Sequence, residues 1–125
     1  MARVRLHIHL GGEHSLGPGK VQLLESVHVH GSISAAARSM GMAYRHAWEM
    51  IDDLNQAFRR PVVATASGGQ DGGGASLTPF GEDLVRRFRA MEAATKRAIA
   101  SDLRALGLPV PGARRTPRAR ASAKR

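Results

Sequence analysis

Residues 32–58 carry the sequence pattern that most restricts the fold of this chain. The alanine-rich stretch at 32–39 begins with serines that can cap a helix, and Gly41 can adopt the positive φ of a tight turn. From residue 44 onward, apolar side chains recur at helical spacing, which predicts an amphipathic helix of about four turns. Two helices joined by a short glycine-containing turn predict a helix-turn-helix. The apolar positions of the second helix are Tyr44, Ala47, Trp48, Ile51, Leu54 and Phe58.

The chain that precedes this motif predicts one strand and one helix. Residues 3–10 alternate between polar and apolar side chains, as is typical of a half-buried strand, and a glycine pair ends it. Proline suits the first position of a helix and glycine suits its end, so Pro18 and Gly31 predict a helix over residues 18–30. The strand residues expected to face the core are Val4, Leu6, Ile8 and Leu10.

The chain that follows the motif predicts a hairpin and a long helix. Residues 62–66 and 75–78 have the pattern of short strands, and the glycine-rich segment between them favours a flexible tip. Thr78 can cap the next helix, Pro79 suits its first position, and we expect it to continue to about residue 106. A helix of roughly 27 residues is about 40 Å long, so we expect its outer half to pack against a second subunit. The predicted fold is mostly α with a small β component: a winged helix-turn-helix with an N-terminal strand and a long C-terminal dimerisation helix.

The composition fits one domain and excludes several classes of protein. The chain has 125 residues, no cysteine and no apolar run long enough to cross a membrane, so we expect a soluble, cytoplasmic protein without disulfides. The glycine-rich segment lacks the Lys-Ser/Thr of a phosphate-binding loop. No nucleophile with its base can be assembled from a known motif. We therefore expect neither an enzyme nor a cofactor.

The basic residues are distributed unevenly along the chain. Six of the 19 lysines and arginines lie after residue 108, where no acidic residue occurs, and the remaining 13 basic and 10 acidic residues leave a net charge of +3. We expect residues 1–108 to form the folded domain and residues 109–125 to be a disordered basic tail attracted to polyanions, as in nucleoid association. A merely solubilising tail is the alternative. The basic residues of the tail are Arg114, Arg115, Arg118, Arg120, Lys124 and Arg125.

Several ordered blocks of the sequence resemble a known family. Gly-Ser-Ile-Ser-Ala-Ala-Ala at 31–37, Gly-Met-Ala-Tyr-Arg-His-Ala-Trp at 41–48 and Gly-Gly-Gly-Ala-Ser-Leu-Thr at 72–78 resemble the N-terminal DNA-binding domain of the molybdate-responsive ModE regulators, over about residues 18–91. The first block is also similar to the LysR-type helix-turn-helix. The resemblance implies that the second helix of the motif enters the major groove, that the wing approaches the backbone or minor groove, and that the long helix and the N-terminal strand form a dimer.

Carried onto this chain, the resemblance assigns DNA contacts to the start of the second helix. Arg45 can pair with guanine or a phosphate, and His46 can donate to a base edge or a phosphate, because the first residues of a recognition helix are those that reach the bases. The candidate contacts, including residues of the preceding helix and of the wing, are Ser34, Arg38, Ala43, Tyr44, Arg45, His46, Gly68, Gly69, Gln70, Gly72 and Gly73.

Other side chains of the recognition helix are expected to have structural roles. Glu49, Asp52 and Asp53 would repel phosphate, so we expect them to point away from DNA. Trp48 and Tyr44 lie on the apolar line of the helix, and we expect both mainly in the core, where aromatic side chains at helical spacing usually lie.

The sequence departs from the family at position 43 and at its C-terminal end. Ala43 stands where the family usually has serine, which removes a helix cap or phosphate contact, so the family's operator preference is not carried over. The C-terminal oxyanion-binding domains of the family are not in this sequence, so the resemblance implies a stand-alone DNA-binding domain. Its signal is then expected from an effector-sensing protein in trans, or from another source.

Three functions remain as hypotheses. The first is a homodimeric, bacterial-type transcriptional regulator that binds an inverted repeat in double-stranded DNA. The second is an architectural protein whose tail coats DNA with little specificity. The third is a sensor in which His7 and His9, on one face of the strand, bind a metal or an oxyanion. No cysteine or carboxylate stands at a standard ligand spacing with them, which favours solvated histidines and no metal.

Overall fold

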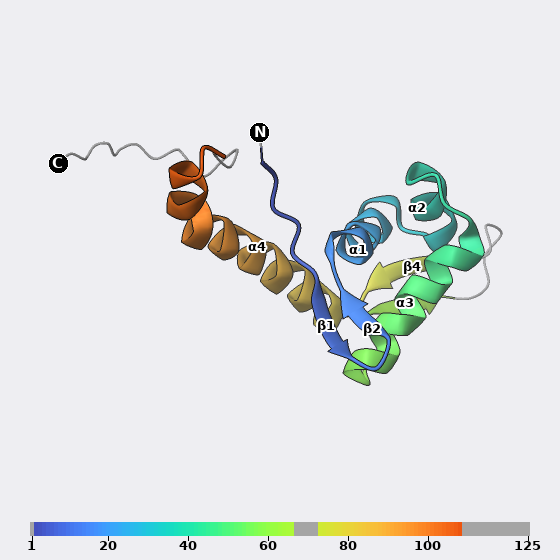
Figure 1. Cartoon of the computed structure of the whole chain (residues 1–125). Coiled ribbons are helices and arrows are strands. Elements are labelled where there is room, and N and C mark those ends of the chain that lie inside the picture. Colours follow the sequence, from blue (N-terminus) through green and yellow to red (C-terminus); the bar gives the residue numbers. More distant parts are fainter. Residues whose placement is uncertain (1, 67–72, 109–125) are drawn as a thin grey trace. The chain divides into compact units, whose positions relative to one another are not determined.

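The computed structural model describes residues 2–66 and 73–108 of the 125. Residues 7–88 form one compact unit, and residues 2–6 with residues 89–108 belong to a second. Helices predominate in the described chain and the strands form two short pairs, so the expected class, mostly α with a small β component, is confirmed. The elements in Figure 1 are β1 Ile8–Gly11, β2 His14–Leu16, α1 Pro18–His30, α2 Ile33–Ser39, α3 Tyr44–Phe58, β3 Val63–Ala66, β4 Gly74–Leu77 and α4 Pro79–Ala105.

Helix α1 begins and ends where the sequence predicts. Pro18 is its first residue, and Gly17 ahead of it is extended. At the other end Gly31 is left-handed, with a φ of 72°, and its N–H donates to the carbonyl oxygen of Val27 at 2.8 Å. Glycine adopts this conformation without the steric cost that a Cβ would bring. Gly31 therefore ends the helix and directs the chain into α2.

Helices α2 and α3 form the predicted helix-turn-helix. The Ser32 hydroxyl accepts a hydrogen bond from the N–H of Ala35 at 2.9 Å, so Ser32 is the cap of α2, one of the two serines the sequence offered. Gly41 has a φ of 67° in the turn. Helix α3 is followed by Arg59, which is left-handed with a φ of 57°. Caps and turn residues thus delimit both helices locally.

One face of each helix forms the core of residues 7–88. Figure 1 shows α1, α2 and α3 grouped beside β4, which pairs with β3. The periodicity of α3 correctly predicts its buried side at Ala47, Ile51 and Leu54, each no more than 1% exposed. Burial of one large apolar side chain contributes about 1.5–3 kcal/mol, so this cluster holds the helices in place. The other buried side chains are Leu16, Val21, Leu23, Leu24, Val27, Ile33, Ala36, Ala37, Val62, Val63, Leu84 and Phe88.

The N-terminal strand is shorter than predicted and has a partner strand. Exposed and half-buried side chains alternate over residues 3–10 as expected, but the strand β1 itself begins only at Ile8. It pairs antiparallel with β2, which sets Ile8 opposite Leu16. Gly11, the last residue of β1, and Gly12 in the turn have positive φ of 101° and 57°. The sequence pattern did not indicate β2, because a strand of three residues is too short to show alternation.

Strands β3 and β4 form the predicted wing. They are antiparallel, with Val63 opposite Leu77 and Ala66 opposite Gly74. The base of the wing is attached to the helices, because the N–H of Ala75 donates to the carbonyl oxygen of Gly31 at 2.8 Å. Residues 67–72, where the sequence predicts the wing tip, lie outside the described residues.

Helix α4 has the predicted length and the predicted cap. The Thr78 hydroxyl accepts from the N–H of Gly81 at 2.9 Å and donates to the carbonyl oxygen of Pro61 at 2.8 Å. This residue therefore starts the helix and ties it to the beginning of the wing. The helix covers 27 residues from Pro79 to Ala105. No described helix is both long and apolar enough to cross a membrane.

Candidate nucleic-acid interface

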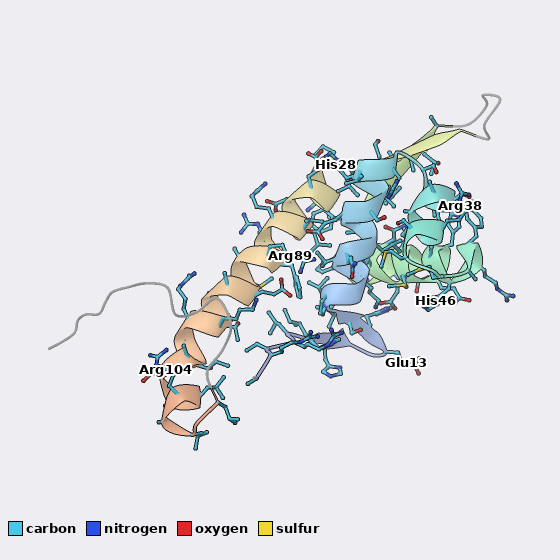
Figure 2. The ribbon with its side chains drawn as sticks, turned by 90° about the horizontal axis from the view of Figure 1, so that it is seen from above. Glu13, His28, Arg38, His46, Arg89 and Arg104 are labelled. Carbon is cyan, nitrogen blue, oxygen red and sulfur yellow. The ribbon has the colours of Figure 1, made fainter. Side chains whose placement is uncertain are left out.

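The first turn of α3 presents two of the predicted contact residues to solvent. The side chains of Arg45 and His46 are 89% and 59% exposed. Figure 2 shows His46 on α3 and Arg38 on α2, both on the side of the unit that these two helices form. The structure thus brings side chains from two helices of the motif onto one surface, with two arginines among them.

Glu49 belongs to the same surface as Arg45 and His46. Its carboxylate oxygens lie 3.7 Å from Nε of Arg45 and 3.5 Å from Nδ1 of His46. The reason is helical geometry, because residues three and four positions apart are neighbours on a helix surface. Glu49 therefore partly offsets the positive charge at the exposed end of α3.

Tyr44 is not a core residue, contrary to expectation. It is 54% exposed, while Trp48 is half-buried, and the two rings meet edge to face with centroids 6.4 Å apart. Tyr44 continues the apolar line of α3, but it is the first residue of the helix, at an end that the core does not cover. Its hydroxyl-bearing ring therefore joins the exposed surface.

Ser34 and Arg38 interact with one another on α2. Nη1 of Arg38 donates to Oγ of Ser34 at 3.1 Å, and both side chains are exposed. The guanidinium has five N–H donors, so this bond leaves others for a further acceptor. Ala43, just before α3, provides no side-chain cap, as its lack of a hydroxyl predicts.

A groove with a volume of about 290 Å³ separates the start of α3 from the base of the wing. We call it the wing groove. Three predicted contact residues, Ser34, Tyr44 and Gly73, meet in it, although they come from three different parts of the chain. None of its lining residues carries a charged side chain. They are Ser32, Ile33, Ser34, Tyr44, Trp48, Thr65, Ala66, Gly73, Gly74 and Ala75.

Asp53, in the second half of α3, is held by two basic side chains. Its carboxylate accepts a hydrogen bond from Nζ of Lys20 at 2.5 Å and contacts Nδ1 of His14 at 2.7 Å. A carboxylate only accepts, so Nδ1 of His14 carries a proton in this contact. Burial acts to raise the pKa of Asp53, but the hydrogen bonds from Lys20 and His14 outweigh it and lower the pKa.

The structure assigns no binding role to the remaining predicted site residues. His7 and His9 are both exposed, and the ring of His7 lies against Gly17. Among the described residues, no three His, Cys, Asp or Glu side chains are grouped so as to hold a metal ion, and the metal-sensor hypothesis gains no support from them. The predicted contacts Gly68, Gly69, Gln70 and Gly72, and the basic residues after residue 108, lie outside the described residues.

Sequence reasoning missed several residues of this region. Lys20 and His14 are 33 and 39 residues away from Asp53, so no local pattern indicates their contact. Thr65 gave no signal either, since its place in the wing groove depends on how the hairpin meets the helices. The position of Glu49 did have a signal, because it stands four residues after Arg45 on a predicted helix.

Comparison with known families matches this arrangement. The sequence profile of the bacterial regulatory helix-turn-helix proteins of the lysR family matches residues 19–82, about half of the chain. The matched segment contains α2, α3 and both strands of the wing. This chain belongs to that family. In this helix-turn-helix protein, the exposed first turn of α3 is therefore the start of the second helix of the family's motif.

Curated relatives of this helix-turn-helix protein confirm the relation to ModE that the sequence blocks indicated. The molybdenum-pterin-binding protein MopB of Rhodobacter capsulatus is 42% identical over 93 residues, which is 74% of this chain and 34% of MopB. The molybdenum transport protein ModE of Azotobacter vinelandii is 36% identical over 92 residues, 74% of this chain and 33% of the relative. The DNA-binding transcriptional dual regulator ModE of Escherichia coli K12 is 34% identical over 87 residues, 70% of this chain and 33% of the relative. The chain thus spans about a third of the length of these relatives.

Proposed function

We propose that this protein is a cytoplasmic, sequence-specific DNA-binding transcriptional regulator that binds an inverted-repeat operator as a homodimer. The observation that carries the proposal is the exposed first turn of α3, with Arg45 and His46 open to solvent beside a wing. In helix-turn-helix proteins this end of the second helix reaches the base edges in the major groove. Membership of a family of bacterial regulators supports the same function.

Arg45 is the residue proposed to read a base. Its side chain is 89% exposed, and Glu49, its one charged partner within the described part of the chain, lies 3.7 Å away, beyond a normal hydrogen bond, so the guanidinium fork is accessible. Such a fork matches O6 and N7 of guanine with two parallel hydrogen bonds. His46 is proposed to donate to a neighbouring base edge or phosphate, and Arg38 to bind the backbone and fix the register.

The second part of α4 is proposed as the dimer contact. Met91 is 38% exposed there, and Leu106 and Leu108 just beyond the helix are 72% and 48% exposed. Apolar side chains exposed along a helix of 27 residues are suited to packing against the same helix of a second copy. A twofold dimer places its recognition helices in successive major grooves about 34 Å apart, which accounts for an inverted repeat.

The regulatory signal is proposed to come from a partner protein, and the basic residues after residue 108 are proposed to assist DNA binding. Some relatives carry names that refer to molybdenum, which makes an effector-sensing protein acting in trans, with a molybdenum-related signal, the first partner to test. Residues 1–108 are proposed as the DNA-binding domain. The six basic residues after residue 108 add sequence-independent attraction to phosphate.

Selection of binding sites from random duplex DNA tests the function. The full chain is used at about 150 mM salt, where non-specific electrostatic attraction is weakened. An enriched inverted repeat supports a dimeric, site-specific regulator and identifies its operator. Binding at low salt without any enriched sequence overturns the proposal in favour of architectural coating.

Deletion of residues 110–125 then separates the tail from the domain. The specific site should still be bound, with a shallower dependence on salt, because at most six phosphate contacts are lost and each contributes about 0.9 to the slope. Loss of sequence preference on deletion would contradict the assignment of specificity to α3.

A further inference from the structure

We propose that the wing groove holds one sugar-phosphate strand of the operator through uncharged hydroxyl groups, with Tyr44 and Thr65 donating to phosphate oxygens. This inference rests on the proposed DNA-binding function and adds the residues and the chemistry of a second contact. Its measurable signature is a contribution to affinity that does not depend on salt, because neutral donors displace no counterions from DNA.

The walls of the groove are held at a fixed separation. One wall is the base of the wing, where the N–H of Ala75 donates to the carbonyl oxygen of Gly31 at 2.8 Å. Gly74 lies so close to Gly31 that a Cβ would come within 3.2 Å of the same oxygen. The other wall is the start of α3, whose next turn is anchored in the core by Ala47. A ligand that enters the groove therefore meets a preformed site, which lowers the entropy cost of binding.

Four hydroxyl groups line this preformed groove, those of Ser32, Ser34, Tyr44 and Thr65. Among the described residues, no hydrogen bond involves the hydroxyl of Tyr44 or of Thr65. The hydroxyl of Ser34 accepts from Arg38 at 3.1 Å, and a hydroxyl that accepts one bond can still donate its own proton. Hydrogen bonds from such donors to charged oxygens are stronger than those between neutral groups.

A DNA strand fits the location and the composition of the groove. Tyr44, which lines the groove, directly precedes Arg45 on the surface proposed to enter the major groove. The lining of the wing groove combines hydroxyl groups with methyl groups and glycine backbone, so it offers hydrogen-bond donors to phosphate oxygens and apolar contacts to deoxyribose.

The test compares hydroxyl removal with charge removal in the full chain. Binding of the duplex obtained by selection is measured for Y44F and T65V at several salt concentrations between about 100 and 300 mM. Each variant loses only an oxygen or exchanges it for a methyl group. We expect each to bind about fivefold to tenfold more weakly, which matches the loss of one hydrogen bond, with an unchanged slope of log affinity against log salt. R38A should instead make the slope shallower by about 0.9.

Ser76 provides the matched control. It is an exposed hydroxyl residue on β4 that does not line the groove, so S76A should bind as the unaltered protein does. Thermal unfolding of each variant identifies any loss of binding that comes from unfolding. Ethylation of single phosphates in the operator should identify one phosphate whose ethylation weakens the unaltered protein but adds nothing to the defect of Y44F.

The outcomes separate this inference from the function on which it rests. If Y44F and T65V bind normally while R45A binds weakly, the groove does not hold DNA and the proposed function stands. If the variants lose affinity together with a changed salt slope, the uncharged contact is wrong. If R45A also binds as the unaltered protein does, the proposed recognition surface fails as well.

Discussion

The second half of α3 is fixed by contacts with other elements, whereas its first turn is exposed to solvent. In the second half, Asp53 contacts Lys20 and His14, which attaches the helix to α1 and to the hairpin of β1 and β2. At the first turn, the charged partner of Arg45 and His46 among residues 2–66 and 73–108 is Glu49, on the same helix, at 3.5 Å or more. One end is tied to two other elements, α1 and β2, and the other is left open to a partner.

The anchored end continues past the last residue of the helix. Oδ1 of Asn55 accepts a hydrogen bond from the N–H of Val62 at 2.8 Å, which links α3 to the start of the wing. The ring of Phe58 meets that of Phe80 edge to face, with centroids 5.5 Å apart, and the Arg60 guanidinium lies 4.1 Å from the centroid of the Phe80 ring. Apolar, polar and cation–π contacts thus converge where α3, the wing and α4 meet.

This contrast shows how a small protein can present a rigid recognition surface at the first turn of α3. Side chains that bind a partner have to be exposed, so they contribute little to the packing that holds their helix in place. Their orientation is set instead by contacts about two turns away, which a bound partner does not disturb. Changes at the anchored end should therefore alter folding, and changes at the open end should alter binding.

Gly81→Ala should have the largest effect, a loss of stability through disrupted packing where α4 meets the start of the wing. A Cβ at this position would collide with the carbonyl oxygen of Val62, a backbone atom that cannot move aside cheaply. We expect the free energy of unfolding to fall by about 3 kcal/mol. Urea unfolding measures it. Gly19→Ala is the control, because its Cβ would meet only Met50 at 4.0 Å and alanine favours a helix, so stability should rise by up to about 1 kcal/mol. Equal effects of the two changes would contradict the assigned packing.

Arg45→Ala should have the next largest effect, at the open end. If the guanidinium reads a base, the preference for the selected operator over other DNA should fall by about 1–3 kcal/mol, while the unfolding midpoint stays unchanged. Competition binding at one salt concentration measures the preference. Arg86→Ala removes the same charge from α4, where Arg87 still pairs with Asp83, and should leave the preference intact. An equal loss of affinity for all sequences would show that Arg45 binds phosphate instead.

Asp53→Asn should weaken the anchored end in a pH-dependent way. The pKa of Asp53 is lowered in the folded state, so its contribution is present above the unfolded pKa of about 3.9 and is lost as pH falls through the lower folded value. We expect the variant to lose about 1–2 kcal/mol of unfolding free energy at pH 7, and the difference to shrink below about pH 4.

Urea unfolding of both proteins at pH 7, 5 and 3 measures this difference. Asp52→Asn is the neighbouring control, since Asp52 is exposed and bonds only to Gln56 among the described residues, so its loss should change stability by less than about 0.5 kcal/mol. A constant difference at all three pH values would show that the Asp53 carboxylate charge is not the source of the stability.

Glu49→Gln should have the smallest effect, at the open end. Removing its charge frees Arg45 and His46 and lessens repulsion of phosphate, so affinity for all DNA sequences should rise by roughly threefold, or about 0.6 kcal/mol, at low salt. Anisotropy titrations with operator and non-operator duplexes measure it. Weaker binding to the operator alone would show that Glu49 itself accepts a hydrogen bond from a base.

The helices and the wing were predictable because their signals are local. Pro18 and Gly31 delimit α1, and Thr78 with Pro79 starts α4, since caps and turn residues act on backbone groups only a few positions away. The strand β2 was not predictable, because it exists through pairing with β1 and shows no periodicity of its own. The class of the fold thus followed from local chemistry, and the N-terminal hairpin did not.

Which residues share a surface was decided only by the tertiary structure. The sequence alone placed Arg45 and His46 at the start of an amphipathic helix after a glycine turn. Helical spacing and helix caps depend only on residues a few positions apart. The sequence could not bring Thr65 to the wing groove or Lys20 to Asp53, because these contacts join positions far apart in the chain. Nor could periodicity show that Tyr44 is 54% exposed, since burial depends on what other elements cover. Local free energies select the elements, and packing between distant segments decides which of their side chains remain open to a partner.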